Sequence, residues 1–407
     1  MRPQEEHRST LIHGIRRLYT LNPKKPGLGE MEYASILVYG DMVRWIGPSK
    51  DAPSADVVVD AMGLIALPGL IDPHTHAVWA GSRANEFARR LAGEHYAEIL
   101  ESGGGILSTV EATRQASLHS LRCGVIERLN HMHKRGVTMV EVKSGYGLNP
   151  EVEARMLDAA DPGNTGPRVI RTFLGAHTIP KEYRGKRDQY VQQIIEEQLP
   201  RCAPLADFVD VYCDRGAFTL DEAVSILKAG KKHGLKLRAH AEQVTHTGMA
   251  EAAAKLGATA IDHLERIDDA GIAAMAKSGS VAVLLPGAQL YLQDKPPPVE
   301  TLREAGIPMA IGTDLNPGSS PVHDLWTAAT LACVTQGLNM EEALLGITRN
   351  AALALGCKRA GWLGTLSHAD IALYAPPVGE PPTFEGLIQH MGGPHAVHLI
   401  QQGKVIY

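Results

Sequence analysis

The stretch Leu67-Pro68-Gly69-Leu70-Ile71-Asp72-Pro73-His74-Thr75-His76 joins a short apolar run to two histidines that stand two residues apart. An apolar run without polar alternation is typical of a strand that is buried on both faces. In an extended segment, residues two apart point to the same side, so both imidazoles can face one point. The stretch therefore predicts a buried strand whose C-terminal end carries a candidate metal site, since metal ions such as zinc bind imidazole nitrogen.

Seven further candidate strands follow along the chain, each before a stretch with helical periodicity such as residues 220–233. Eight successive strand–helix units are typical of the (β/α)8 barrel, in which the chemistry lies at the C-terminal ends of the strands. Those ends are where we look for the functional site. The candidate strands are residues 67–71, 138–142, 169–173, 208–212, 235–239, 260–261, 281–285 and 309–311.

The two ends of the chain have a different pattern. Short β-rich pieces alternate with turn residues at 35–38, 43–46 and 57–59, and again at 371–374 and 396–400. We therefore predict an α/β fold with two parts. Residues 67–358 form a (β/α)8 barrel, and residues 1–66 and 359–407 together form a small β-sandwich domain.

Composition excludes several classes of protein. The net charge of -5 over 407 residues leaves no basic excess to neutralise a nucleic-acid backbone. No apolar run reaches the 18 or so residues that cross a bilayer, so we expect no membrane segment. The first residues lack a signal-peptide pattern, and the five cysteines are scattered without a C-x-x-C pair. We expect reduced, mostly buried thiols and a cytoplasmic protein.

Three other predicted strand ends carry side chains that bind metals, namely His240, His263 and Asp314. Because the strand ends share one rim of the barrel, these side chains join His74 and His76 there. Three imidazoles and a carboxylate are a plausible ligand set for zinc or ferric iron, with a position left for water. The residues alone do not decide between the two metals.

A second pair of histidines with the same spacing, His131 and His133, serves as an internal control. It falls in a predicted helix, where residues two apart do not face each other. We expect this pair on a solvated helix face and not in a metal site.

The H-x-H stretch with the later histidines and aspartate resembles the amidohydrolase superfamily, which combines a metal-dependent barrel with a β-sandwich built from both termini. Binuclear members usually carry a bridging lysine at the end of strand four. This chain has Tyr212-Cys213-Asp214-Arg215 there, which favours a mononuclear site. Deaminases of this layout often have a glutamate three residues after the strand-five histidine. Gln243 occupies that position, with Glu242 adjacent, which weakens a deaminase interpretation.

Longer motifs narrow the resemblance to the imidazolonepropionase family over essentially the whole chain. These motifs are residues 76–87, 103–110, 141–148, 173–177 and 312–321. The resemblance implies hydrolysis of 4-imidazolone-5-propanoate to N-formimino-L-glutamate by a metal-activated water, with one zinc or ferric ion per subunit of a homodimer. It implies metal ligands at His74, His76, His240 and Asp314, and catalytic roles for Asp314, His263 and Glu242.

The resemblance also implies a substrate-binding group. Arg83 suits the propionate tail because its planar fork matches a carboxylate, although an ion pair with Glu86 or Glu94 is the alternative. Plain turn or loop roles are the alternatives for Tyr146, His177 and Gly318. The expected substrate-binding residues are Arg83, Tyr146, His177, Gln243, Asn316, Gly318 and Ser319.

Two other functions stay open on the residues alone. One is a related mononuclear amidohydrolase or deaminase that acts on a nucleobase-like ring. The other is a non-catalytic barrel that serves as a scaffold, which four convergent metal-binding groups argue against. Release of ammonia from nucleobases would favour the first, and an empty metal site would favour the second.

Overall fold

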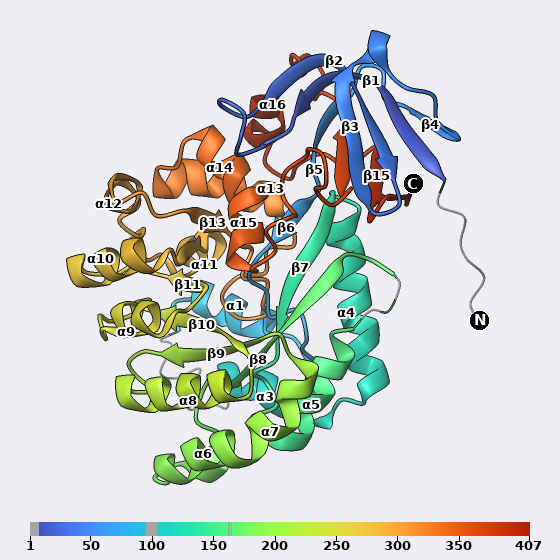
Figure 1. The fold of residues 1–407 in the computed structure, drawn as a ribbon. Coiled ribbons are helices and arrows are strands. Elements are labelled where there is room, and N and C mark those ends of the chain that lie inside the picture. Colours follow the sequence, from blue (N-terminus) through green and yellow to red (C-terminus); the bar gives the residue numbers. More distant parts are fainter. Residues whose placement is uncertain (1–7, 95–103, 162, 164) are drawn as a thin grey trace.

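The computed structural model describes residues 8–94, 104–161, 163 and 165–407, so Gly103 of the 103–110 motif lies outside the described residues. Within them, eight parallel strands follow one another in chain order around a barrel, and helices cover its outer side (Figure 1). This confirms the predicted α/β barrel. The barrel strands are β6 (Leu70–Asp72), β7 (Val137–Lys143), β8 (Arg168–Ala176), β9 (Phe208–Cys213), β10 (Lys236–Ala241), β11 (Ala260–His263), β12 (Val281–Leu284) and β13 (Met309–Ile311).

The barrel closes just beyond its first and last strands, β6 and β13. Thr75 and Leu315 form a parallel bridge there. The Asp314 backbone N–H donates to the His74 carbonyl at 3.0 Å, and the His76 N–H donates to the Leu315 carbonyl at 3.0 Å. Closure of the barrel therefore joins the segments that carry the predicted metal ligands.

The helices on the outside of the barrel begin at the sequence signals that favour helix starts. Thr219 and Glu222 form a capping box before α8, and Asn149 accepts from the Val152 N–H before α5. The helices of the barrel segment are α1 (Ala84–Leu91), α3 (Ile106–Gln115), α4 (Leu118–His133), α5 (Pro150–Ala159), α6 (Arg187–Gln193), α7 (Leu199–Cys202), α8 (Leu220–Lys232), α9 (Met249–Leu256), α10 (Asp269–Ser278), α11 (Pro286–Leu292), α12 (Val299–Glu304), α13 (Leu325–Leu331), α14 (Met340–Gly346) and α15 (Arg349–Ala354). The π-helical turns are η3 (Ile194–Gln198) and η5 (Ala332–Gln336), and the 3₁₀ turns are η1 (Ser49–Asp51), η2 (Lys181–Tyr183) and η4 (Ala203–Leu205).

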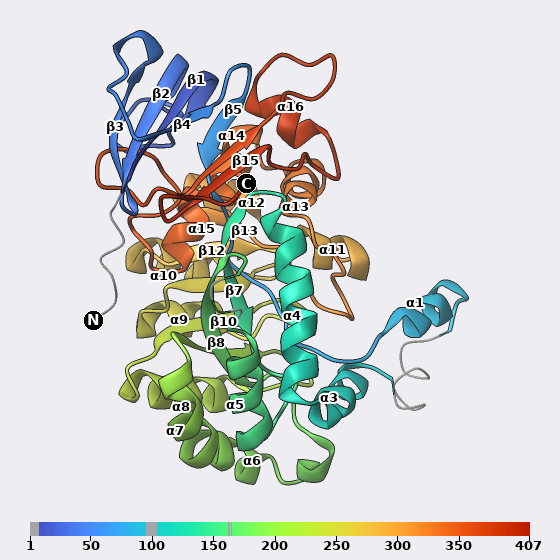
Figure 2. The same ribbon diagram turned by 90° about the vertical axis from the view of Figure 1, so that its right-hand side faces the viewer.

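The two ends of the chain form one mixed sheet at one end of the barrel, as predicted (Figures 1 and 2). It curls around its own apolar core, which draws on both ends of the chain. Its order is β16-β15-β14-β5-β1-β2-β3, with β4 on β1. The strands are β1 (Ser9–Tyr19), β2 (Glu30–Tyr39), β3 (Met42–Pro48), β4 (Val57–Asp60), β5 (Ile65–Pro68), β14 (Ile371–Tyr374), β15 (His398–Gln401) and β16 (Lys404–Val405), and α16 (Phe384–Gln389) lies between β14 and β15.

Two details of the strand prediction were wrong. The predicted strand at 67–71 is two strands, because Gly69 donates to the Asp370 carbonyl and the chain passes there from β5 of the small sheet to β6 of the barrel. The expected boundary between residues 66 and 67 therefore falls within β5. The long strand β1 was missed, since a register shift between Ile12 and Ile15 interrupts the alternation by which strands are recognised.

The control pair of histidines lies on α4, as expected, but only His131 is exposed. His133 is buried, and its Nε2 lies 2.7 Å from Oε1 of Gln401 on β15. The expectation of a fully solvated pair was therefore wrong, because His133 packs where α4 meets the small sheet. No helix in the described part of the chain has both the length and the apolar character needed to cross a membrane.

Gly136, between α4 and β7, tests the contact between barrel and small sheet. Its φ is +92°, and a Cβ there would overlap the hydroxyl of Tyr374, which donates to the Arg135 carbonyl at 2.9 Å. Gly279 has a φ of +75° but open space around it, so Gly279→Ala isolates the backbone strain. We predict that Gly136→Ala lowers the free energy of unfolding by about 1–3 kcal/mol more than Gly279→Ala does. Urea unfolding measures both, and equal losses would contradict the prediction.

Candidate metal centre and active site

Four predicted metal ligands converge at the mouth of the barrel, next to the place where the first and last strands are joined. Three of the four are histidines. One ring nitrogen from each of His74, His76 and His240 lies within 4.8 Å of the others. Oδ1 of Asp314 lies 3.4 Å from Nε2 of both His74 and His76. All four side chains are buried. The structure thus brings together residues from β10 and from the segments after β6 and β13, which are remote in the sequence.

The ring nitrogens of this group have the partners that a metal site needs. Nε2 of His74 and of His240 is buried, and none of the described residues forms a hydrogen bond with either nitrogen. The opposite nitrogens, Nδ1 of His74 and of His240, lie 3.0 Å from carboxylate oxygens of Asp262 and Asp210 respectively. A carboxylate at Nδ1 keeps the proton on that nitrogen and leaves Nε2 free to bind a metal. Buried imidazoles and a carboxylate therefore fit a borderline ion such as zinc.

Burial sets the charge of these groups. It lowers the pKa of His74 and His76 well below the ordinary value, and that of His240 as well, although Asp210 opposes the last shift. The three imidazoles are thus neutral, which is the state that binds metals. Burial raises the pKa of Asp314 to about 7, against the influence of His263.

A cluster of buried charges supports the histidines from inside the barrel. Nζ of Lys143 lies 2.8 Å from Glu141, 2.8 Å from Asp210 and 3.7 Å from Asp262. Arg238 donates to both oxygens of Asp262, at 2.9 and 3.1 Å. All five side chains are fully buried. The two carboxylates that contact the metal-binding histidines are therefore held by a lysine and an arginine.

No site role was predicted from the sequence for these five residues. A signal was present, because Glu141, Lys143, Asp210 and Arg238 interrupt strands that are otherwise apolar. Charged residues are almost never fully buried unless they are paired, so charges within a predicted barrel strand indicate an internal network. Only the structure shows which charge contacts which.

His263 lies beside the metal-binding group at the end of β11. Its ring centroid is 5.4 Å from that of His240 and 6.0 Å from that of His74. Burial tends to lower the pKa of His263, but the neighbouring Glu265, with Asp314 and Asp262, raises it above its ordinary value. The ring can therefore act on a molecule bound next to the histidine group.

Glu242 points away from that group. Its carboxylate accepts from the Thr247 N–H at 2.6 Å and from the Ala250 N–H at 3.1 Å, at the start of α9. Nδ1 of His246 lies 3.2 Å from the same carboxylate. These contacts fix the loop between β10 and α9.

Strained backbone marks the same rim of the barrel. Glu242, His263, Leu264 and Asp314 all have positive φ values, of 59°, 79°, 74° and 51°. Such conformations are uncommon for residues other than glycine and often occur at functional sites. The backbone at three of the strand ends is thus shaped to direct particular side chains.

Two aromatic side chains from the expected substrate group border the histidines. The His177 ring stacks on His76, with centroids 5.0 Å apart, and lies 5.3 Å from the Tyr146 ring. Nδ1 of His177 lies 2.9 Å from the Gly145 carbonyl, so it carries the proton and leaves Nε2 as an acceptor. Burial raises the pKa of Tyr146, so its hydroxyl stays protonated as a donor.

Arg83 and Gly318 meet across the mouth of the barrel. A Cβ on Gly318 would overlap the guanidinium of Arg83, so the absence of a side chain lets the arginine lie there. Arg83 also pairs with Glu86 at 2.8 Å, as one alternative for this residue expected. Glu94 instead pairs with Arg89. Arg83 therefore forms an ion pair with Glu86 and also lies beside the strand-eight loop.

Asn316 organises that strand-eight loop. Its Oδ1 accepts from the N–H groups of Gly318 and Ser319 at 2.8 and 2.7 Å, and from the Ser319 hydroxyl at 3.2 Å. Its side-chain amide donates to the Asp314 carbonyl at 2.7 Å. Gln243 is buried, after the end of β10. Most of the hydrogen bonds that Asn316 and Ser319 form are thus within the loop.

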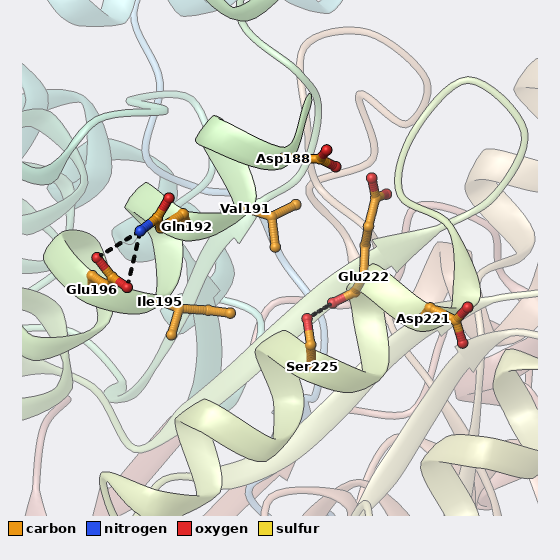
Figure 3. A pocket seen from close by; sticks show the side chains of 8 residues that line it. All are labelled: Asp188, Val191, Gln192, Ile195, Glu196, Asp221, Glu222 and Ser225. Carbon is orange, nitrogen blue, oxygen red and sulfur yellow. Dashed lines mark hydrogen bonds between the residues drawn. The ribbon is translucent and has the colours of Figure 1, made fainter. Parts of the chain in front are cut away.

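A pocket of about 400 Å³ lies elsewhere on the molecule and contains none of these residues. Helices α6 and α8 and the turn η3 line it, with Val191 and Ile195 among the carboxylates of Asp188, Glu196 and Asp221 (Figure 3). The chemistry of the chain therefore centres on the barrel mouth and not on this surface pocket.

The fold and the buried group define a barrel protein with a cluster of histidines and an aspartate that is consistent with a metal site. A model of the amidohydrolase family matches residues 89–407. The imidazolonepropionase of Idiomarina loihiensis is 44% identical over 356 residues, which cover 86% of this chain and 87% of that protein. The imidazolonepropionase of Caldanaerobacter subterraneus subsp. tengcongensis is 41% identical over 405 residues, 96% of each chain. The chain belongs to the amidohydrolase family and, within it, to the imidazolonepropionases.

A solved structure agrees on the fold. A variant of atrazine chlorohydrolase from Arthrobacter aurescens TC1, complexed with zinc and atraton, superposes with a TM-score of 0.67 at 20% identity. The match covers 98% of this chain and 95% of that one.

Lys143→Met tests the buried charge cluster. The methionine keeps most of the volume but leaves Glu141 and Asp210 without their cation. We predict a loss of about 3–5 kcal/mol in the free energy of unfolding, as for other buried pairs that lose one partner. Lys228→Met on the exposed face of α8 is the control and should change it by less than about 0.5 kcal/mol. Urea unfolding that gives the same midpoint for both variants would refute the importance of the cluster.

Proposed function

We propose that the chain hydrolyses 4-imidazolone-5-propanoate to N-formimino-L-glutamate by opening the cyclic amide. Family membership supports the reaction. The observation that carries the proposal is the strand-eight loop, in which Asp314 lies 3.4 Å from Nε2 of His74 and His76 while Gly318 lies against the Arg83 guanidinium. The mouth of the barrel therefore offers both a metal site for the ring carbonyl and a cation for the propionate.

We assign the metal to one zinc or ferric ion held by His74, His76, His240 and Asp314. When bound, such an ion supplies an activated water near neutral pH and polarises a carbonyl. The donor set fits both ions, and zinc is the ion in the atrazine chlorohydrolase relative.

Proton transfer falls to Asp314 and His263 in this proposal. Asp314 accepts the proton of the attacking water and passes it to the ring nitrogen as the C–N bond breaks. His263, oriented by Glu265, donates a hydrogen bond to the oxygen that gains charge. The expected proton-transfer role of Glu242 stays a prediction, but its contacts with the start of α9 favour a positioning role for this residue.

The remaining residues recognise the substrate. Arg83 donates to the propionate, Tyr146 donates through its protonated hydroxyl, and Nε2 of His177 accepts from a ring N–H. Gln243 reaches the ring from the end of β10. Gly318 leaves room for Arg83, while Asn316 and Ser319 hold the loop in which Gly318 lies.

We further propose a homodimer in a reducing compartment such as the cytoplasm. The five cysteines are free, and two of them are buried. An exposed apolar surface on α1 and α11, with Phe87 stacked on Tyr291 beside Leu91 and Leu290, is the candidate contact. Sedimentation equilibrium should give twice the 43.8 kDa of one chain, and a monomer would contradict this assembly.

The activity itself is tested with urocanate hydratase supplying the unstable imidazolone. We predict metal-dependent loss of imidazolone propionate and no release of ammonia from cytosine, guanine or adenine. Asp314→Asn should lower turnover by about 10²–10⁴-fold, the usual contribution of a proton-transfer group. Asp188→Asn, at an exposed carboxylate of α6, is the matched control. Ammonia release from a nucleobase without imidazolone hydrolysis would instead support the deaminase alternative.

Gly318→Ala tests the site for the propionate. The new methyl group would displace the Arg83 guanidinium, while the φ of Gly318 is not in the left-handed region, so the fold should tolerate it. We predict a KM about 10-fold higher, the value of one charge-assisted hydrogen bond. Gly386→Ala on α16, where the nearest atom is 3.5 Å from the new Cβ, should leave KM unchanged. Equal KM values for the two variants would contradict the role of Arg83.

A further inference from the structure

The segment of residues 77–83 joins the metal-binding His76 to Arg83 without regular structure. Its first residues, Ala77 and Val78, are fully buried, so their backbone groups need partners within the protein. Arg128 of α4 is one such partner. It donates from Nη1 to the Ala77 carbonyl at 2.9 Å and from Nη2 to the Trp79 carbonyl at 3.4 Å.

Arg128 also packs on the segment through its planar face. The guanidinium carbon lies 3.3 Å from the centroid of the Trp79 ring. A planar cation above an indole ring gains electrostatic attraction, which only arginine combines with two directed N–H donors. The same side chain thus fixes both the backbone and the aromatic ring of the segment.

The positive charge of Arg128 is not shared with a carboxylate. Among the described residues, none places a carboxylate oxygen within 4.0 Å of its guanidinium nitrogens. Burial lowers the pKa of this arginine to about 10. Arg83, in contrast, pairs with Glu86, which also accepts from the Gly105 N–H and the Ser108 hydroxyl at 3.1 Å.

Both arginines act on the same hydroxyl. The charges of Arg83 and Arg128 each oppose the rise in the pKa of Tyr146 that burial and Asp314 cause. The Tyr146 ring also lies 6.0 Å from that of His76, the residue just before the segment that Arg128 holds. Arg128 is partly buried, and within the described part of the chain it has no carboxylate partner, which an anionic ligand would provide.

We propose that Arg128 is a positioning residue for the carboxylate of the substrate. It holds the segment 77–83 on α4, so that Arg83 keeps its place beside Gly318. This role rests on the proposed function for the identity of the substrate. It extends that function, because Arg128 acts on the carboxylate end through Arg83 and not on the metal.

The test uses Arg128→Met, which removes the charge and the donors, and Arg128→Lys, which keeps only the charge. Arg122→Met is the control on the same helix, where Arg122 forms a partly exposed pair with Asp158. We expect Arg128→Met to raise KM about 10-fold while kcat and metal content stay within about 3-fold of the unchanged protein. Arg128→Lys should remain impaired, since an ammonium cannot replace the planar fork. Arg122→Met should change neither constant.

Binding of 3-(imidazol-4-yl)propanoate, a non-reacting imidazole with the same tail, gives a readout without turnover. Its Kd should rise about 10-fold in Arg128→Met, while that of the corresponding amide should not change. In an Arg83→Met background, Arg128→Met should add little further effect, because the two act together. Unchanged KM and Kd, or full additivity of the two substitutions, would overturn the proposal. Absence of turnover in the unsubstituted protein would instead count against the proposed function.

Discussion

The pairing of charges inside the barrel is the constraint on which the site depends. Asp210 and Asp262 are fully buried, and contacts with Lys143 and Arg238 offset the cost of burying two carboxylates. Each carboxylate also meets Nδ1 of a histidine, His240 or His74, which orients that ring and leaves its Nε2 free. The orientation of these two histidines at the mouth is therefore set by ion pairs deeper inside the barrel. A substitution in that layer should disturb the site without touching a ligand.

Closure of the barrel adds a second constraint at the same place. The hydrogen bonds between the segments after β6 and β13 run through the backbone of His74, His76 and Asp314 themselves. The predicted metal ligands are thus also residues that close the barrel. The site is therefore complete only when β13 has joined β6. The positive φ of Asp314 is held by this closure. The small sheet packs at the opposite end and leaves the mouth to the loops (Figure 2).

Much of this arrangement could be predicted from the sequence, because it repeats a simple pattern. Apolar runs followed by His74, His240, His263 or Asp314 identify strand ends in a barrel, and alternation identifies most strands of the small sheet. The pattern failed where local geometry departs from the regular period, as at the bulge in β1 and at Gly69. It could not show that Glu242 faces α9 or that Arg128 reaches the Ala77 carbonyl, because side-chain direction depends on tertiary contacts.

We propose that one metal ion sits among His74, His76, His240 and Asp314 and that the barrel acts through it. Anomalous X-ray diffraction at the zinc and iron absorption edges, on crystals of catalytically active protein, tests this most directly. We expect one strong peak per chain, about 2.0–2.2 Å from Nε2 of the histidines and from an oxygen of Asp314. Active protein with no peak there, or with its peak between Asp210 and Asp262, would contradict it.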